Sequence, residues 1–99
     1  MKDIDYKGIV EFAKLSYEYE PGTKKAVDEG IMSMNELTIY HYINHWTNQN
    51  IPKYNSMEEL DRLHGKTLAK AFYVAKDVFK ISPLEAKTIF FKVCKIPRA

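Results

Sequence analysis

The sequence predicts an all-α protein: a compact single-domain bundle (residues 1–99) of four to five helices around a long central helix at about residues 57–80. Three serines are each followed three residues later by a glutamate, which is the capping-box signature of a helix start. These pairs are Ser33 with Glu36, Ser56 with Glu59 and Ser82 with Glu85. After Met57, apolar residues recur at helical spacing and fill about half of the helical wheel, wider than a surface helix needs. No segment alternates polar and apolar residues convincingly, as a half-buried strand would.

The N-terminal part predicts one medium and one short helix. Asp3 or Asp5 can cap a first helix at about residues 5–19, which the pair Pro21-Gly22 ends. Its expected inner side comprises Tyr6, Ile9, Val10, Ala13 and Tyr17. Thr23 is then expected to cap a short helix over residues 24–29, with Gly30 as its C-terminal stop.

The third helix runs from Ser33 to about Asn48, and a connection rich in amides and prolines leads to the helix at 57–80. Its expected core side comprises Ile39, Tyr42, Ile43 and Trp46, and the opposite side comprises Met34, Leu37, His41, Asn44, His45 and Asn48. Ser82, Pro83 and Glu85 start a last helix that reaches about Lys95. Its expected inward residues are Ala86, Ile89, Phe90, Val93 and Cys94.

Charge is distributed unevenly along the chain. Residues 1–61 carry six lysines against eleven acidic residues, whereas residues 62–99 carry nine basic residues against two acidic ones. Such an asymmetry indicates either an anionic partner for the basic part or packing of acidic against basic elements. The start of the chain has no apolar signal-peptide region, no run of 18 apolar residues occurs, and Cys94 is the single cysteine. We therefore expect a cytoplasmic protein without a membrane partner.

Catalytic and metal-binding patterns are weak. His41 and His45 lie one helical turn apart and could share a metal, but a zinc site needs further ligands, and only His64 or Cys94 could supply them. A hydrogen-bonded core histidine is the more usual explanation for His64, and Cys94 is expected to be a small core residue. The four glycines are isolated, so no phosphate-binding loop is present. We expect no enzymatic activity, no metal and no cofactor.

Aromatic content favours a protein partner. Seven Tyr, five Phe and one Trp are too many for a core of this size, and Tyr and Trp are enriched at interfaces. The predicted partner-binding residues are Tyr40, His41, His45, Tyr54 and Tyr17. The sequence thus favours a small non-enzymatic regulatory or inhibitory binding protein that acts through protein–protein contacts, including contacts with a second copy of itself.

Nucleic-acid binding is the alternative function. The outer side of the 57–80 helix carries Arg62, Lys66, Lys70, Tyr73, Lys76 and Lys80, a pattern that suits phosphate contact combined with base stacking. Ala26, Gly30 and Ile31 also resemble the turn of a helix-turn-helix motif. In that arrangement Asn35, Thr38 and Tyr40 would be exposed on a recognition helix, although that helix contains no Lys or Arg.

Overall fold

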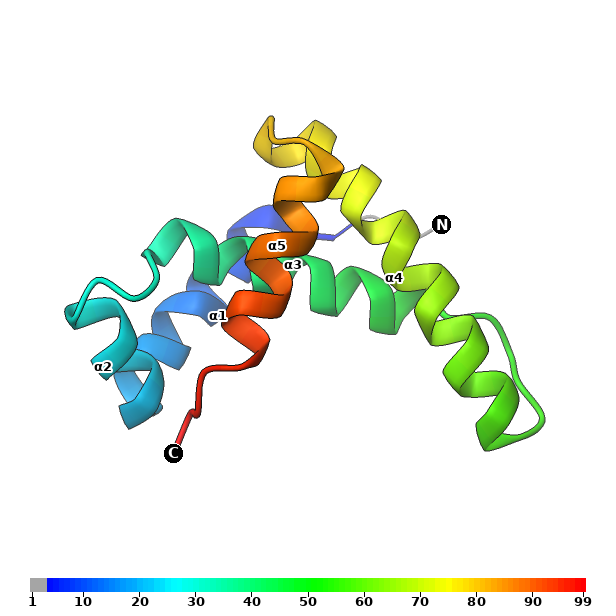
Figure 1. Ribbon diagram of the computed structural model, residues 1–99, viewed down its shortest axis with the longest axis horizontal. Coiled ribbons are helices and arrows are strands. Elements are labelled where there is room, and N and C mark those ends of the chain that lie inside the picture. The colour runs from blue at the N-terminus through cyan, green and yellow to red at the C-terminus, as the bar shows by residue number, and fades with distance from the viewer. Residues whose placement is uncertain (1–3) are drawn as a thin grey trace.

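The computed structural model describes residues 4–99, and the part it describes contains five α-helices and no strand, which confirms the predicted all-α class (Figure 1). The helices are α1 (Tyr6–Tyr19), α2 (Pro21–Asp28), α3 (Met34–Asn50), α4 (Met57–Phe79) and α5 (Pro83–Cys94). Across residues 4–99 every helix is too short or too polar to span a bilayer. The molecule measures 41 × 29 × 24 Å along its principal axes.

Serine hydroxyl groups fix three of the helix starts, as predicted. The hydroxyls of Ser33, Ser56 and Ser82 accept hydrogen bonds from the backbone N–H groups of Glu36, Glu59 and Glu85 at 3.0, 3.1 and 3.0 Å. Each bond satisfies an N–H group that has no partner inside its helix. The first cap of the chain is Asp5, whose carboxylate accepts from the backbone N–H of Lys7; the other predicted cap, Asp3, lies outside the described residues.

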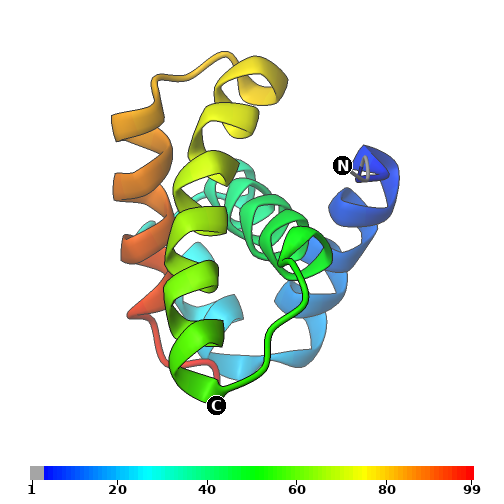
Figure 2. The ribbon, with the colours of Figure 1, turned by 90° about the vertical axis from the view of Figure 1, so that its right-hand side faces the viewer.

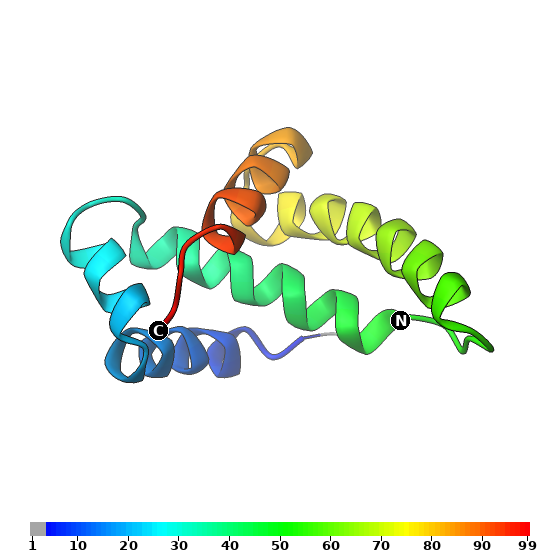
Figure 3. The ribbon, with the colours of Figure 1, turned by 60° about the horizontal axis from the view of Figure 1, so that its bottom comes forward.

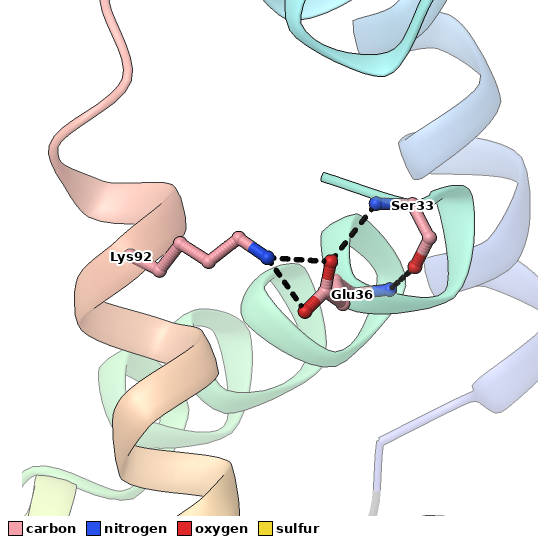
Figure 4. A network of polar contacts seen from close by, with 3 residues as sticks. All are labelled: Ser33, Glu36 and Lys92. Atoms are coloured by element: carbon pink, nitrogen blue, oxygen red, sulfur yellow. Dashed lines mark hydrogen bonds and ion pairs between the residues drawn. The ribbon is translucent and has the colours of Figure 1, made fainter. Parts of the chain in front are cut away.

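The cap of α3 also ties α5 to the rest of the molecule (Figure 4). Glu36 returns the hydrogen bond by accepting from the Ser33 N–H at 3.0 Å, so the capping box is complete. The ammonium group of Lys92 on α5 donates to both Glu36 oxygens at 2.9 Å. Burial raises the pKa of the Glu36 carboxyl, but the bonds from Lys92 and Ser33 outweigh it and hold that pKa below its usual value.

The short second helix begins earlier than predicted. Pro21 is its first residue, and Thr23 is buried inside the helix, where its hydroxyl donates to Glu20 Oε1 at 2.8 Å. The prediction of Thr23 as the cap was wrong because proline lacks an N–H group and has a helix-like φ, so it starts a helix well. Gly30 follows the helix with a φ of 76°, in the left-handed region that glycine adopts without strain, as a C-terminal stop requires.

Helix α3 occupies the middle of the structure, between α1 on one side and α4 with α5 on the other (Figure 3). Its buried residues come from several sides: Leu37, Thr38, Ile39, His41, Tyr42, Ile43, Trp46 and Thr47. Leu37 and His41 are thus buried, although they belong to the side predicted to lie opposite the core. The long helix α4 matches its predicted bounds to within a residue, but it packs along one side of α3 with α5 beside it (Figure 2).

The core consists mainly of aliphatic side chains from α3 and α5 with aromatic side chains around them. Leu37, Ile39, Ile43 and Val93 are fully buried. Two further predictions of inward residues were wrong, since Cys94 is exposed and Tyr6 is 47% exposed. Helix α1 instead buries Ile9, Ala13 and Ser16.

Candidate interaction surfaces

The five predicted partner-binding residues do not form one surface. Tyr40, His41 and His45 come together on α3, where the ring of Phe12 from α1 packs against both histidines at 4.8 and 4.7 Å between centroids. Tyr17 lies on α1 beside α2. Tyr54 is 48% exposed in the connection between α3 and α4, at the end of the molecule away from α2 (Figure 1).

His41 is a core residue that holds α1 against α3. Its side chain is 4% exposed, and its Nε2 atom forms a 2.9 Å hydrogen bond with the Ser16 hydroxyl. Burial lowers the pKa of His41 to about 4, and the positive charges of Arg98 and His45 act in the same direction, while Glu20 opposes them. His41 is therefore neutral at physiological pH and is unavailable to an external partner.

Tyr40 is also committed to internal contacts. Its ring stacks on Phe90 of α5, with 5.1 Å between centroids. The guanidinium group of Arg98, which follows α5 in the chain, lies 4.7 Å from the centroid of the same ring. Arg98 in turn donates to Glu20 Oε1 at 3.3 Å. The half-buried Tyr40 thus joins α3, α5 and the residues after α5.

Tyr17 links α1 to α2 through polar contacts. Its hydroxyl donates to Asp28 Oδ1 at 2.6 Å and accepts from Lys24 Nζ at 3.0 Å, and the same ammonium group pairs with Asp28. The hydrogen bond from Tyr17, followed by that from Lys24, lowers the pKa of Asp28, and the bonds to Tyr17 and Asp28 raise the pKa of Lys24. These contacts give Tyr17 a structural role in the α1–α2 pair.

An exposed apolar stripe on α1 was missed by the sequence analysis. Phe12, Leu15 and Tyr19 are 42%, 51% and 76% exposed, on a side of the helix that does not include the buried Ile9 and Ala13. Their spacing of three and then four residues places them on one side of a helix. That spacing was the available signal; we call these three residues the α1 stripe.

Four of the basic residues predicted on the long helix share one open side of it, whereas Lys80 follows the helix as its C-cap, where the backbone is left-handed (φ 58°) and helical spacing no longer places the side chain. Arg62, Lys66, Lys70, Lys76 and Lys80 are all exposed, and Tyr73 among them is 65% exposed. The ion pairs formed within residues 4–99 use Lys14, Lys24, Lys92 and Arg98, and none involves a residue of α4. We call the five cations with Tyr73 the basic side of α4.

The helix-turn-helix arrangement does not leave a free recognition helix. Thr38 is 7% exposed and donates to the Met34 carbonyl at 2.8 Å, so the expectation that it would be exposed was wrong. Tyr40 is half-buried against Phe90, as described above, while Asn35 is exposed. Two of the three positions that would read a DNA groove are thus engaged within the fold, and α1, α4 and α5 all pack on α3.

The histidine pair does not bring further metal ligands together. The His41 and His45 ring centroids are 6.3 Å apart. Within residues 4–99 there is no group of three or more His, Cys, Asp or Glu side chains arranged to hold a metal ion.

Comparison with known proteins gives no match: no family model matches the sequence, and no curated protein and no solved structure is detectably similar to the chain.

Proposed function

We propose that this chain is a small, non-enzymatic regulatory or inhibitory protein that works in the cytoplasm by binding another protein through the α1 stripe. The observation that carries the proposal is the exposure of Phe12, Leu15 and Tyr19 along one side of a helix. Two large aliphatic or aromatic side chains and a tyrosine on one side of a helix suit recognition in which that helix lies in an apolar groove of the partner.

The surroundings of the stripe resemble those of a binding surface. Charged side chains lie next to it, since Glu11, Lys14 and Glu18 are exposed, and an apolar centre with a polar rim is the usual anatomy of an interface. Helix α1 is held by the buried Ser16–His41 hydrogen bond and by the Tyr17–Asp28 hydrogen bond. A preformed helix loses little conformational freedom on binding, which favours affinity.

A pull-down from extracts of the native host, followed by affinity measurement with the purified partner, tests the proposal. The probe variant is Leu15→Gln, which removes the apolar side chain at the centre of the stripe and keeps a good helix former. The matched control is Leu84→Gln on α5, where the leucine is 73% exposed. We expect Leu15→Gln to weaken binding at least tenfold, or about 1.4 kcal/mol, and the control to bind as the unmodified protein does.

Two results would contradict this proposal. One is a partner whose affinity is the same for the unmodified protein and for Leu15→Gln. The other is an absence of any stoichiometric protein partner combined with a monomeric mass in sedimentation analysis, because a second copy of the chain is among the expected partners. A dimer that dissociates on Leu15→Gln would identify the partner as the chain itself.

A further inference from the structure

We propose that the basic side of α4 binds single-stranded nucleic acid, with the phosphates paired to its cations and a base stacked on Tyr73. This site is separate from the α1 stripe and does not rest on the function proposed for it.

The spacing of the cations suits a linear polyanion. Arg62, Lys66 and Lys70 follow one another at intervals of four residues, which places them about 6 Å apart along the helix axis. Lys76 continues the series after Tyr73, so the four cations within α4 span about 21 Å along its axis, and Lys80 follows at the C-cap of the helix. A strand that carries one negative charge per nucleotide can therefore meet several of these cations in turn.

The cations are also free to act on an external anion. Every one of them is exposed, and in residues 4–99 none takes part in an ion pair. The opposite side of the helix is fixed, because Ala71 and Ala75 are fully buried and Phe72 packs against Phe90 of α5 at 5.9 Å. The C-terminal half of α4, which carries Lys70, Tyr73 and Lys76, is therefore anchored to the core before binding.

Tyr73 distinguishes this surface from an ordinary lysine-rich helix face. It is 65% exposed and lies between Lys70 and Lys76 in the sequence, on the same side of α4 as the cations. An exposed aromatic ring among phosphate-binding cations is the arrangement that stacks an unpaired base. A base in a duplex is already stacked on its neighbours, so this ring favours single strands.

Other anionic partners fit less well. A membrane surface is normally bound by a helix that inserts its apolar side, but the apolar side of α4 packs on α3 and α5. The carboxylate of Asp77, four residues after Tyr73, is exposed as well, and it lowers the positive potential of this surface for every anionic partner alike. An acidic protein segment has no base to stack on the Tyr73 ring. Substitution of Tyr73 should therefore weaken the binding of a nucleic acid more than the binding of an acidic protein segment.

The test is fluorescence anisotropy with a labelled single-stranded oligonucleotide of about 20 nucleotides, as KCl is raised from about 50 mM to about 200 mM. We expect micromolar affinity at the lowest salt. In a plot of the logarithm of the association constant against the logarithm of the salt concentration, each phosphate neutralised in a single strand contributes about −0.7 to the slope. The slope should therefore reach about −3.5 if all five cations each neutralise one phosphate. No binding at the lowest salt, or binding that salt does not weaken, would overturn the proposal.

A charge-reversal variant with a matched control locates the site. Changing Lys66, Lys70 and Lys76 together to Glu should lower affinity at least tenfold, with an unchanged helical circular dichroism spectrum. The control variant changes three other exposed lysines to Glu, all of them outside α4: Lys7, Lys25 and Lys95. The control and the probe variant therefore have the same net charge. If the control loses as much affinity as the probe, binding reflects net charge and the site is refuted. Should the Glu variant unfold, the corresponding Gln variant takes its place, with the same expected direction.

Two single changes test the role of the ring and of its acidic neighbour. Tyr73→Ala should lower affinity at least about fivefold, the effect of losing one stacked base, and Tyr73→Trp should restore it. Tyr19→Ala, which removes a 76% exposed tyrosine from α1, should have no effect. Asp77→Asn should raise affinity. Equal losses in Tyr73→Ala and Tyr19→Ala, or tighter binding to polyglutamate or to anionic vesicles than to the oligonucleotide, would refute the assignment to single-stranded nucleic acid.

Discussion

Replacing the buried His41 with glutamine should remove most of the acid sensitivity of this fold between about pH 7.5 and pH 5. His41 is 4% exposed and is held between Phe12 and Tyr40, with its Nε2 bonded to the Ser16 hydroxyl. A protonated imidazolium in this place would lose its hydration and would lie near Arg98 and His45. The glutamine amide keeps a hydrogen-bonding group for Ser16 but takes up no proton.

The magnitude follows from the difference in pKa between the folded and the unfolded chain. The pKa of His41 falls from its ordinary 6.5 to about 4 because the side chain is buried. As the pH falls below about 6.5, the unfolded chain binds the proton first, so the free energy of unfolding decreases until about pH 4 and is then constant. At 1.36 kcal/mol per pKa unit the complete loss is about 3.4 kcal/mol, of which about 2 kcal/mol occurs by pH 5.

Urea unfolding followed by circular dichroism at about pH 7.5, 6 and 5 measures this loss, provided that the slope with denaturant is the same at each pH. The unmodified protein should lose about 2 kcal/mol over this range more than His41→Gln does. Nuclear magnetic resonance of the His41 ring gives the folded pKa directly. A ring that titrates near 6.5, or equal pH dependence in the two proteins, would refute the assignment of His41 as a neutral core residue.

Two substitutions elsewhere test the packing. Gly22→Ala should lower the free energy of unfolding by about 1–3 kcal/mol, because the added Cβ would clash with the Pro97 carbonyl oxygen. The clash would also disturb the neighbouring hydrogen bond from the Gly22 N–H to the Arg98 carbonyl. An unchanged or higher urea midpoint would contradict this contact. Ser82→Ala should cost about 1 kcal/mol and lower Tm by about 4–8 °C, because the Glu85 N–H loses its 3.0 Å acceptor. An unchanged Tm would show that this cap contributes nothing.

The starts of α3, α4 and α5 were predictable because a serine–glutamate cap depends on residues only three positions apart. The position of α3 in the middle was not, because its buried side chains include polar ones that a hydropathy pattern assigns to the surface. Thr38 and Thr47 satisfy their hydroxyls on the carbonyls of Met34 and Ile43, each at 2.8 Å. His41 uses Ser16 from a different helix. The polar and apolar sides of α4 are separated along the sequence, so its pattern predicts the central position that α3 occupies.

The difference between contacts within one helix and contacts between distant elements also explains which surface residues were predicted well. Four cations on the basic side of α4 depend on the geometry of one helix, so the sequence alone places them together, whereas the left-handed C-cap Lys80 lies beyond that geometry. Whether an aromatic residue is exposed depends on elements far away in the chain. Tyr40 is covered by Phe90 and Arg98, about 50 and 58 positions further along the chain, and local spacing contains no trace of them. The α1 stripe was missed for the converse reason, since the docking of α1 on α3 decides which side of α1 is open.

The placement of α3 also separates the two proposed binding surfaces. Helix α1 lies on one side of α3, and α4 lies on the other (Figure 3). The basic side of α4 is opposite the residues that pack on the core, so it faces away from α1 as well. Substitutions at sites that share no partner have independent effects. Leu15→Gln should therefore leave oligonucleotide binding unchanged, and the triple lysine change should leave protein binding unchanged. A variant that loses both kinds of binding must act by disturbing the fold, and it would identify neither surface.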